Sequence, residues 1–266
     1  MPDLTVTTTT QSLTLSTAPV TVDKAYNFVY SGTDFDPSES SRMFSEFLGS
    51  ASPFSFSTGT TANPSSGSYL FENSTAAHGF VVLSVNGTQN SRIGVFASAA
   101  STSDVSRTTY IGYGAWTFKA RAYIQQATQQ QRCIVGVGVS HAGVDNSNDQ
   151  TLMLQHGIAF VSYGSTGTWI ATLADNNQLT EIATDVPVTA NGFTTFEIIL
   201  SADGLDLTMK INDSVVYESS DGPFFDYANG VAWGIEMRDK KSGGSNTAGI
   251  VNVDYMDLNY TKTRMP

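Results

Sequence analysis

Apolar and polar residues alternate with a period of two along much of the chain, which predicts β-strands. In the stretch FTTFEIILS, Phe196, Ile198 and Leu200 fall on one face and the residues between them on the other. Similar stretches recur, separated by Gly, Asn, Asp and Ser. The predicted strands are 79–85, 91–98, 116–124, 132–140, 156–163, 168–174, 193–201, 205–212, 214–219, 229–239 and 249–260.

The turns between these strands predict antiparallel hairpins. Asp203-Gly204 and Asn212-Asp213 each separate two predicted strands, and these residue types tolerate the positive φ of tight turns. No alternation of strands with helices and no repeat of 20–50 residues is evident. The sequence therefore predicts an all-β fold, an antiparallel two-sheet sandwich.

The first part of the chain has a different character. Residues 1–30 contain LTVTTTTQSLTL, a Thr-rich segment that favours extended backbone but has little to bury. We expect it to form an N-terminal arm that adds to a sheet of this chain or of a neighbour. The remaining residues, 31–266, are predicted to form the sandwich.

One short helix is predicted at the start of the sandwich, within 36–50. Pro37 would lie in its first turn and Gly49 would end it. An apolar stripe would cover one side of the helix. This stripe consists of Met43, Phe44, Phe47 and Leu48.

Residues 51–68, rich in Ser, Thr, Gly and Pro, are predicted to be an irregular surface segment.

Composition narrows the choice of partner. The chain has 266 residues, of which 40% are hydrophobic and 14% charged, so it can bury a full core without covalent links. Its net charge is −11, from 13 basic and 24 acidic residues, and no basic run occurs. Such a field repels phosphate backbones and anionic lipid, so we expect neither a nucleic-acid partner nor a membrane partner.

Neither the single cysteine nor the N-terminal residues suggest a reactive or targeting function. Cys133 is the only cysteine, so no disulfide can form within the chain, and its apolar neighbours predict a buried thiol. The first residues lack a basic and an apolar signal region, and no apolar run is long enough to cross a bilayer. We therefore expect a product that is soluble in the cytoplasm, and that, if it ends up outside a cell, gets there by lysis or within an assembled particle.

From residue 116 onward, the order of strands resembles the concanavalin A-like lectin/glucanase (laminin-G-like) jelly roll. The resemblance rests on WTFKARAYI, RCIVGVGVS, HGIAFVSYGSTGTWIATL, FTTFEIILSADGLDLTMKINDSVVYES and GVAWGIEMR followed by GIVNVDYMDLNY. It implies the fold but not a function, because this fold hosts lectins, hydrolases and structural modules. Beside a Thr-rich arm, such domains are similar to virion proteins of tailed bacteriophages. The absence of heptads and repeats favours a compact particle-surface protein over a fibre.

Catalytic patterns are weak. A retaining glycosidase needs two carboxylates about 5 Å apart, which related glucanases place on one strand face. Here Glu236 and Asp239, and likewise Asp254 and Asp257, are three residues apart and are predicted to lie on opposite faces, while Glu197 stands alone. No paired spacing among the histidines suggests zinc, and no G-x-S-x-G motif occurs. The sequence thus predicts a protein that is not an enzyme. The three histidines are His78, His141 and His156.

The stretch VGVGVSHAGVDNSNDQ, residues 135–150, suggests two kinds of site. Its glycines alternate with valines and lead to another strand rather than a helix, so we exclude a phosphate loop. Carboxylate and amide oxygens follow within one loop, and these are the ligands that calcium prefers. The alternative is a solvated turn. The candidate calcium ligands are Asp145, Asn146, Asn148 and Asp149.

A glycan site would need an aromatic platform beside amide or carboxylate groups. Tyr163 and Trp169 have such neighbours in Asp175, Asn176 and Asn177. The alternative is that all three tryptophans pack in the core. An exposed tryptophan in a groove would favour a lectin, and a buried one a scaffold. The other two tryptophans are Trp116 and Trp233.

The leading hypothesis from the sequence is a structural virion protein of a bacteriophage, a capsid decoration or another particle-surface component. Its partners would be capsid or tail proteins, bound through the arm and the sheet edges, and we expect a homo-oligomer. The alternative is a glycan-binding adhesin, with a glycoside hydrolase as a distant third. No cofactor is predicted apart from the candidate calcium ion.

Overall fold

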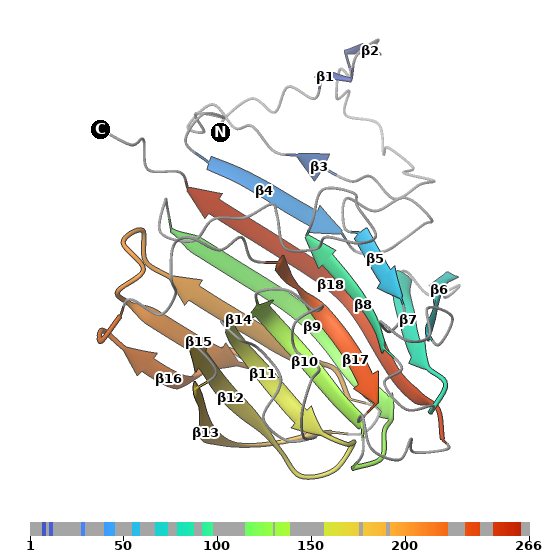
Figure 1. Ribbon diagram of the computed structural model, residues 1–266. Coiled ribbons are helices and arrows are strands. Elements are labelled where there is room, and N and C mark those ends of the chain that lie inside the picture. Colours follow the sequence, from blue (N-terminus) through green and yellow to red (C-terminus); the bar gives the residue numbers. More distant parts are fainter. Residues whose placement is uncertain are drawn as a thin grey trace.

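The chain forms a two-layer β-sandwich in the computed structural model (Figure 1). The strands of each layer pair antiparallel throughout, as the turn chemistry predicts. The structure describes residues 7–8, 11–12, 28–29, 40–45, 55–58, 67–73, 79–87, 92–97, 115–129, 131–138, 157–175, 178–189, 192–222, 232–239 and 247–261.

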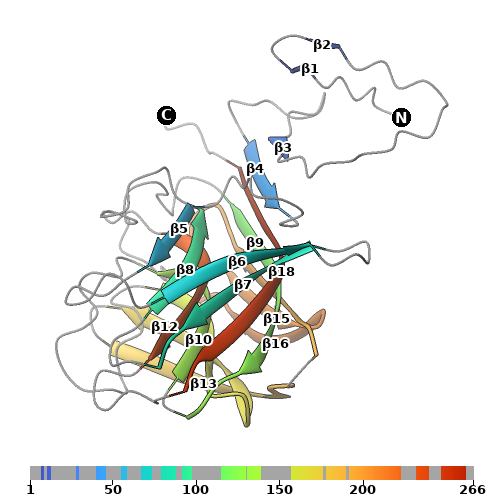
Figure 2. The same cartoon turned by 90° about the vertical axis from the view of Figure 1, so that its right-hand side faces the viewer.

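The larger layer is a nine-stranded sheet. Its strand order is β16-β15-β14-β9-β18-β4-β3, and β7 pairs with both β18 and β6. The last strand, β18, pairs with β9 on one side and with β7 and then β4 on the other. Figure 2 shows β6 and β7 lying along β18. The bounds are β3 Phe28–Val29, β4 Ser40–Ser45, β6 Gly67–Asn73, β7 Gly79–Val85, β9 Trp116–Gln126, β14 Thr194–Leu200, β15 Leu207–Ile211, β16 Ser214–Ser219 and β18 Gly249–Thr261.

The smaller layer is a seven-stranded sheet with the order β13-β12-β11-β10-β17-β8-β5. Two further strands, β1 Thr7–Thr8 and β2 Gln11–Ser12, pair only with each other. The bounds in the seven-stranded sheet are β5 Ser55–Thr58, β8 Arg92–Ala97, β10 Gln131–Gly138, β11 Gly157–Tyr163, β12 Thr168–Asp175, β13 Gln178–Pro187 and β17 Ala232–Asp239.

The core lies between the two sheets and is filled by the inward half of each alternating strand. Phe196 on β14 is fully buried, and its ring lies 4.6 Å from that of Trp169 and 5.3 Å from that of Phe160, both on the opposite sheet. Trp233 on β17 stacks at 5.9 Å on Trp116 of β9. These aromatic contacts between layers fix how the sheets face each other, because aromatic pairs add energy beyond the area that they bury.

The predicted antiparallel two-sheet sandwich is confirmed, and each of the eleven predicted strands corresponds to an observed one. The hairpin turn is also confirmed, since Asn212 and Asp213 have φ of 49° and 64°. Outside the predicted arm, the strands β4, β5, β6 and β13 were not predicted. β13 lies at the edge of its sheet and ends at Pro187, so its exposed face is polar and its alternation is weak.

The predicted helix within 36–50 is wrong where the structure describes it. β4 is a strand that pairs with residues 256–261 of β18. Without β4, the side of β18 away from β9 would have no neighbouring strand along this half, and pairing with a sheet outweighs a local helical pattern. The irregular segment 51–68 is corrected in the same way, because β5 pairs with β8. The part of the chain that the structure describes contains no helix, and so none able to span a membrane.

The predicted arm, residues 1–30, is described only in part. β1 and β2 pair with each other, while β3 pairs with β4 and so joins the nine-stranded sheet. Docking of the arm on a partner stays a prediction.

Candidate functional site

The outer face of the nine-stranded sheet carries a row of four charges of alternating sign. In register across neighbouring strands, Asp257 of β18 lies opposite Lys119 of β9, Lys119 opposite Glu197 of β14, and Glu197 opposite Lys210 of β15. We name these four residues the charge ladder. Their outward position follows from the period of two, since Phe118, Ile198 and Met209 beside them point into the core.

Glu197 is the centre of the charge ladder and joins two lysines. Lys119 Nζ lies 2.8 Å from Glu197 Oε1, and Lys210 Nζ lies 3.2 Å from Glu197 Oε2. The Glu197 side chain is 11% exposed, whereas those of Lys119 and Lys210 are 41% and 27% exposed. The carboxylate is therefore held close to the sheet, and the ammonium groups reach the solvent.

Glu197 and Lys119 each stabilise the charged form of the other. Burial acts to raise the pKa of Glu197, but hydrogen bonds from Lys119 and Lys210, and their positive charges, together keep that pKa below its usual value of 4.5. The hydrogen bond to Glu197 raises the pKa of Lys119 above 10.5. Neither Glu197 nor Lys119 is thus poised to exchange a proton near neutral pH, which a general acid or base requires. The ladder is suited to electrostatic recognition.

We expect Glu197→Gln to lower the free energy of unfolding at pH 7 by about 1 kcal/mol, because two cross-strand ion pairs are lost. The depressed pKa of Glu197 means that its contribution is present above about pH 4.5 and is lost as the pH falls through the lower folded-state value. Urea unfolding at a series of pH values measures this, with the exposed Glu218→Gln on the neighbouring strand β16 as control. A difference between wild type and Glu197→Gln that persists at pH 2 would contradict the assignment.

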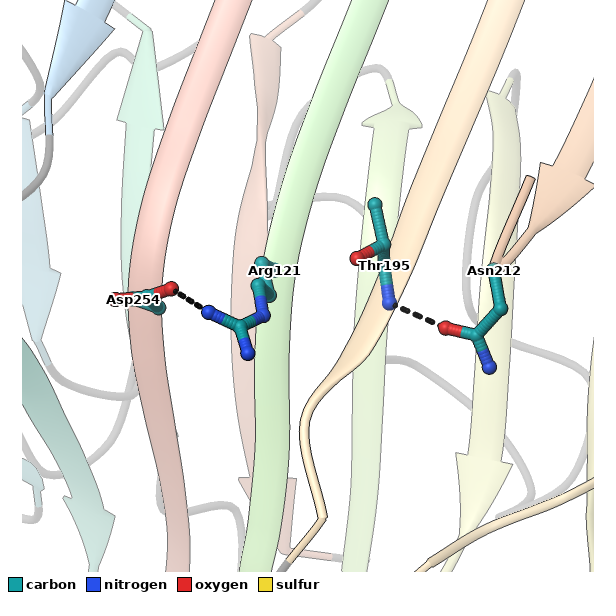
Figure 3. Close-up of polar contacts among 4 residues, drawn as sticks. All are labelled: Arg121, Thr195, Asn212 and Asp254. Carbon is teal, nitrogen blue, oxygen red and sulfur yellow. Dashed lines mark hydrogen bonds and ion pairs between the residues drawn. The ribbon is translucent and has the colours of Figure 1, made fainter.

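A second polar row lies beside the ladder and is drawn in Figure 3. Arg121 of β9 binds Asp254 of β18, with Nη1 and Oδ2 2.6 Å apart, and its guanidinium lies 4.6 Å from the centre of the Phe193 ring. The backbone N–H of Thr195 donates to Asn212 Oδ1 at 3.0 Å. These contacts fix the outer face at both ends of the row.

The position of Asp254 corrects the expectation that Asp254 and Asp257 lie on opposite faces. The register of β18 shifts between Val253 and Tyr255, so one extra residue is inserted there. Such a bulge resets the alternation. Both carboxylates consequently lie on the outer face, Asp254 against Arg121 and Asp257 in the charge ladder.

The outer face of the seven-stranded sheet carries charges too, but they are buried. Arg238 Nε lies 3.0 Å from Glu236 Oε1, and Arg132 stands opposite Arg238 on the next strand. The side chains of Arg238 and Glu236 are only 9% and 3% exposed. Arg132 lies over the ring of Tyr163, 5.0 Å from its centre. This arrangement is a closed ion cluster, whereas the charge ladder is open.

Tyr163 is the half-buried member of this cluster. Its hydroxyl donates to Glu181 Oε1 at 2.6 Å. Burial first, and then this hydrogen bond, raise the pKa of Tyr163 to about 12, so the hydroxyl remains a donor at neutral pH.

The structure does not bring the predicted glycan residues together. Trp169 is 2% exposed on the inner face of β12, so its ring cannot serve as a platform for a sugar. Tyr163 lies on the outer face of β11 instead. Asp175 ends β12, and its side chain, like Asn176 and Asn177, lies outside the described residues. Trp116 and Trp233 are also buried, so all three tryptophans belong to the core.

The predicted calcium ligands, Asp145, Asn146, Asn148 and Asp149, lie outside the described residues, and calcium binding stays a prediction. Within the described residues, no group of three or more His, Cys, Asp or Glu side chains could hold a metal ion. The pKa of the buried Cys133 thiol is raised by burial first and by the charge of Glu236, which fits the predicted inert thiol.

Sequence reasoning missed the cations of the outer face. Lys119 and Arg121 occupy alternate positions of WTFKARAYI, between residues that point inward, and this pattern predicts an outward position. What the pattern could not supply is the register that places Glu197 between Lys119 and Lys210, because these residues come from three different strands.

Comparisons with known proteins support the fold. No protein-family model and no curated protein sequence matches the chain. A solved structure of a protein of unknown function from Shewanella oneidensis MR-1 matches at a TM-score of 0.60 and 11% identity, covering 86% of this chain and 90% of that one. An alginate lyase from Pseudomonas aeruginosa matches at a TM-score of 0.49 and 14% identity, over 71% and 84% of the two chains. The carbohydrate recognition domain of Emp46p matches at 0.44 and 10%, over 80% and 93%. At 11% identity the Shewanella match shows a shared fold and says nothing of function.

Proposed function

We propose that the protein is a structural module of a bacteriophage virion surface and that it docks on its neighbours through the outer face of the nine-stranded sheet. The observation that carries the proposal is the charge ladder, an open row of four alternating charges fixed by cross-strand pairing. Fixed, complementary charges give an interface its orientation and specificity without reorganisation on binding.

The distribution of charge supports this choice of face. Among the residues whose side chains the structure describes, the lysines and arginines that reach the solvent are Lys119, Arg121 and Lys210, and all three lie here. The remaining described pair, Arg132 and Arg238, is buried on the other sheet. Among the described residues, this face is therefore where the positive charges that reach the solvent gather.

Two alternatives are less well supported. A glycan-binding adhesin would need an aromatic platform, and the ring proposed for it, Trp169, packs against Phe196 in the core. An acid–base enzyme would need a group that titrates near neutral pH, whereas Glu197 and Lys119 are held charged by each other. The virion context itself rests on the resemblance of the strand order and on the Thr-rich segment 1–30.

Incorporation into particles tests the proposal. Tagged wild type and Lys210→Glu are expressed in infected cells, particles are purified on a density gradient, and copies per particle are quantified. We expect Lys210→Glu to be incorporated at least tenfold less, because the change reverses one charge of the ladder. The matched control is Thr166→Glu/Thr180→Glu, which alters the net charge equally at two exposed positions, one in the turn between β11 and β12 and one on β13.

Thermal melting of both variants confirms that each is folded before incorporation is compared. Wild-type occupancy by Lys210→Glu, or the absence of wild type from purified particles, would overturn the proposal. A glycan array tests the alternative function. Selective binding of the purified protein to one glycan would favour the adhesin over the structural module.

A further inference from the structure

We infer that the partner of this face is a second copy of the same chain, bound about a two-fold axis. The inference rests on the proposed function, because it assigns a partner to the docking face proposed above. It is argued from the order of the charges, from the polar rows beside them and from the size of the patch.

The order of charges is self-complementary. Across β18, β9, β14 and β15 the charge ladder reads minus, plus, minus, plus, from Asp257 to Lys210. A two-fold axis parallel to the strands, between β9 and β14, places a reversed copy of the row against the original. Asp257 then faces Lys210 of the second copy, and Lys119 faces Glu197. Every position of the ladder then lies across from one of opposite sign, as an isologous interface requires, although the Glu197 side chain is only 11% exposed.

The neighbouring rows are compatible with the same axis. In the row of Figure 3, Arg121 of β9 would face Thr195 of the second copy's β14. In the row on the other side of the ladder, Thr117 of β9 would face Ile199 in the same way. Neither pair places two like charges against each other. The neighbouring rows are therefore compatible with the same two-fold axis as the ladder.

The size of the patch predicts a weak dimer. Four strands about 4.8 Å apart and about 20 Å long present roughly 400 Å² on each copy, or about 800 Å² in total. This area is below the roughly 1,000 Å² of a stable specific interface, so the dimer is expected to be weak and transient. Because ion pairs between the copies hold the interface, the association should also weaken as salt screens the charges.

A charge swap separates an interface from a ladder that only stabilises its own sheet. Lys210→Glu would place a new carboxylate against Asp257 of the second copy, and Asp257→Lys would place a new ammonium group against Lys210. The double variant Asp257→Lys/Lys210→Glu restores opposite charges between copies. Within one chain, however, it places like charges beside Lys119 and Glu197. The double variant therefore restores the contacts between copies while it worsens those within each copy.

Sedimentation velocity over a range of micromolar concentrations, at low and high salt, measures the dimer. We expect wild type to dimerise, each single variant to dimerise at least 100-fold more weakly because symmetry repeats each repulsion, and the double variant to recover within about tenfold of wild type. Wild type that remains a monomer at about 100 μM and low salt, single variants that dimerise normally, or a double variant weaker than either single variant would each overturn the inference.

The two proposals fail in different ways. If wild type is monomeric but Lys210→Glu is lost from particles, the face docks on another virion protein, and only the second copy is excluded. If wild type dimerises as expected but Lys210→Glu is incorporated normally, the dimer stands and the docking role of the face fails.

Discussion

Replacing Trp169 with alanine is expected to lower the free energy of unfolding by about 3–5 kcal/mol. The Trp169 ring is 2% exposed and meets Phe196 of the other sheet edge-on, with centroids 4.6 Å apart. Its removal leaves a cavity at a contact between the two layers. Since both sheets converge there, the surrounding side chains can close only part of it.

Urea unfolding followed by circular dichroism measures this loss without depending on tryptophan fluorescence. The control is Thr168→Ala, which removes an exposed side chain from the adjacent position of β12 and should change stability by less than about 0.5 kcal/mol. A Trp169→Ala variant as stable as the control would place the ring at the surface and revive the glycan platform.

Gly136→Ala is expected to cost about 3 kcal/mol, the second largest effect. Gly136 of β10 pairs with Ala159 of β11, and a Cβ built on Gly136 would lie 2.3 Å from the Ile158 carbonyl oxygen and 2.6 Å from the Ala159 Cα. Both are backbone atoms of a paired strand and cannot rotate away, so the strands must separate or shift register.

Gly167→Ala provides the comparison for Gly136→Ala. Gly167 has a φ of +101°, which an alanine adopts only with strain, but a Cβ there would meet nothing within 4 Å. We expect a loss of about 1 kcal/mol from the backbone strain alone. Equal losses for the two variants, measured by urea unfolding, would show that close approach of β11 is not the reason for glycine at 136.

The strands could be predicted from the sequence because most of them have one face in the core and one outside. The strands β4, β5, β6 and β13 were not predicted, and two of them show why. β4 carries an apolar pattern that also fits a helix, and only its pairing with the end of β18 decides its conformation. β13 is an edge strand, where a polar sequence is tolerated because one side of the strand has no neighbouring strand.

The candidate site was less predictable than the fold. The outward position of Lys119 follows from alternation, but its proximity to Glu197 depends on how β9 and β14 pair across a long stretch of sequence. The bulge at Asp254 is a further case, since a single inserted residue moves a carboxylate to the other face. Trp169 was predicted as a candidate glycan platform because polar loop residues follow it in the sequence. Its side chain instead points into the core, which its sequence neighbours do not indicate.

The outer faces of the two sheets carry charges of different exposure. The charge ladder is on the nine-stranded sheet and the closed ion cluster on the seven-stranded sheet. On the seven-stranded sheet, Arg238 and Glu236 are enclosed and contribute to the specificity of the fold. On the nine-stranded sheet, Lys119 and Lys210 reach the solvent while Glu197 keeps them in register. An exposed row of this kind adds little to stability and is better suited to binding a complementary surface.

Because the proposed function places the chain on a virion surface, the most direct test is electron cryomicroscopy of purified particles from cells that express the chain. The account predicts that density of a neighbouring protein covers the outer face of the nine-stranded sheet, with opposite charges within reach of Lys119 and Lys210. A sandwich whose charge ladder faces open solvent, while another surface contacts the particle, would contradict it.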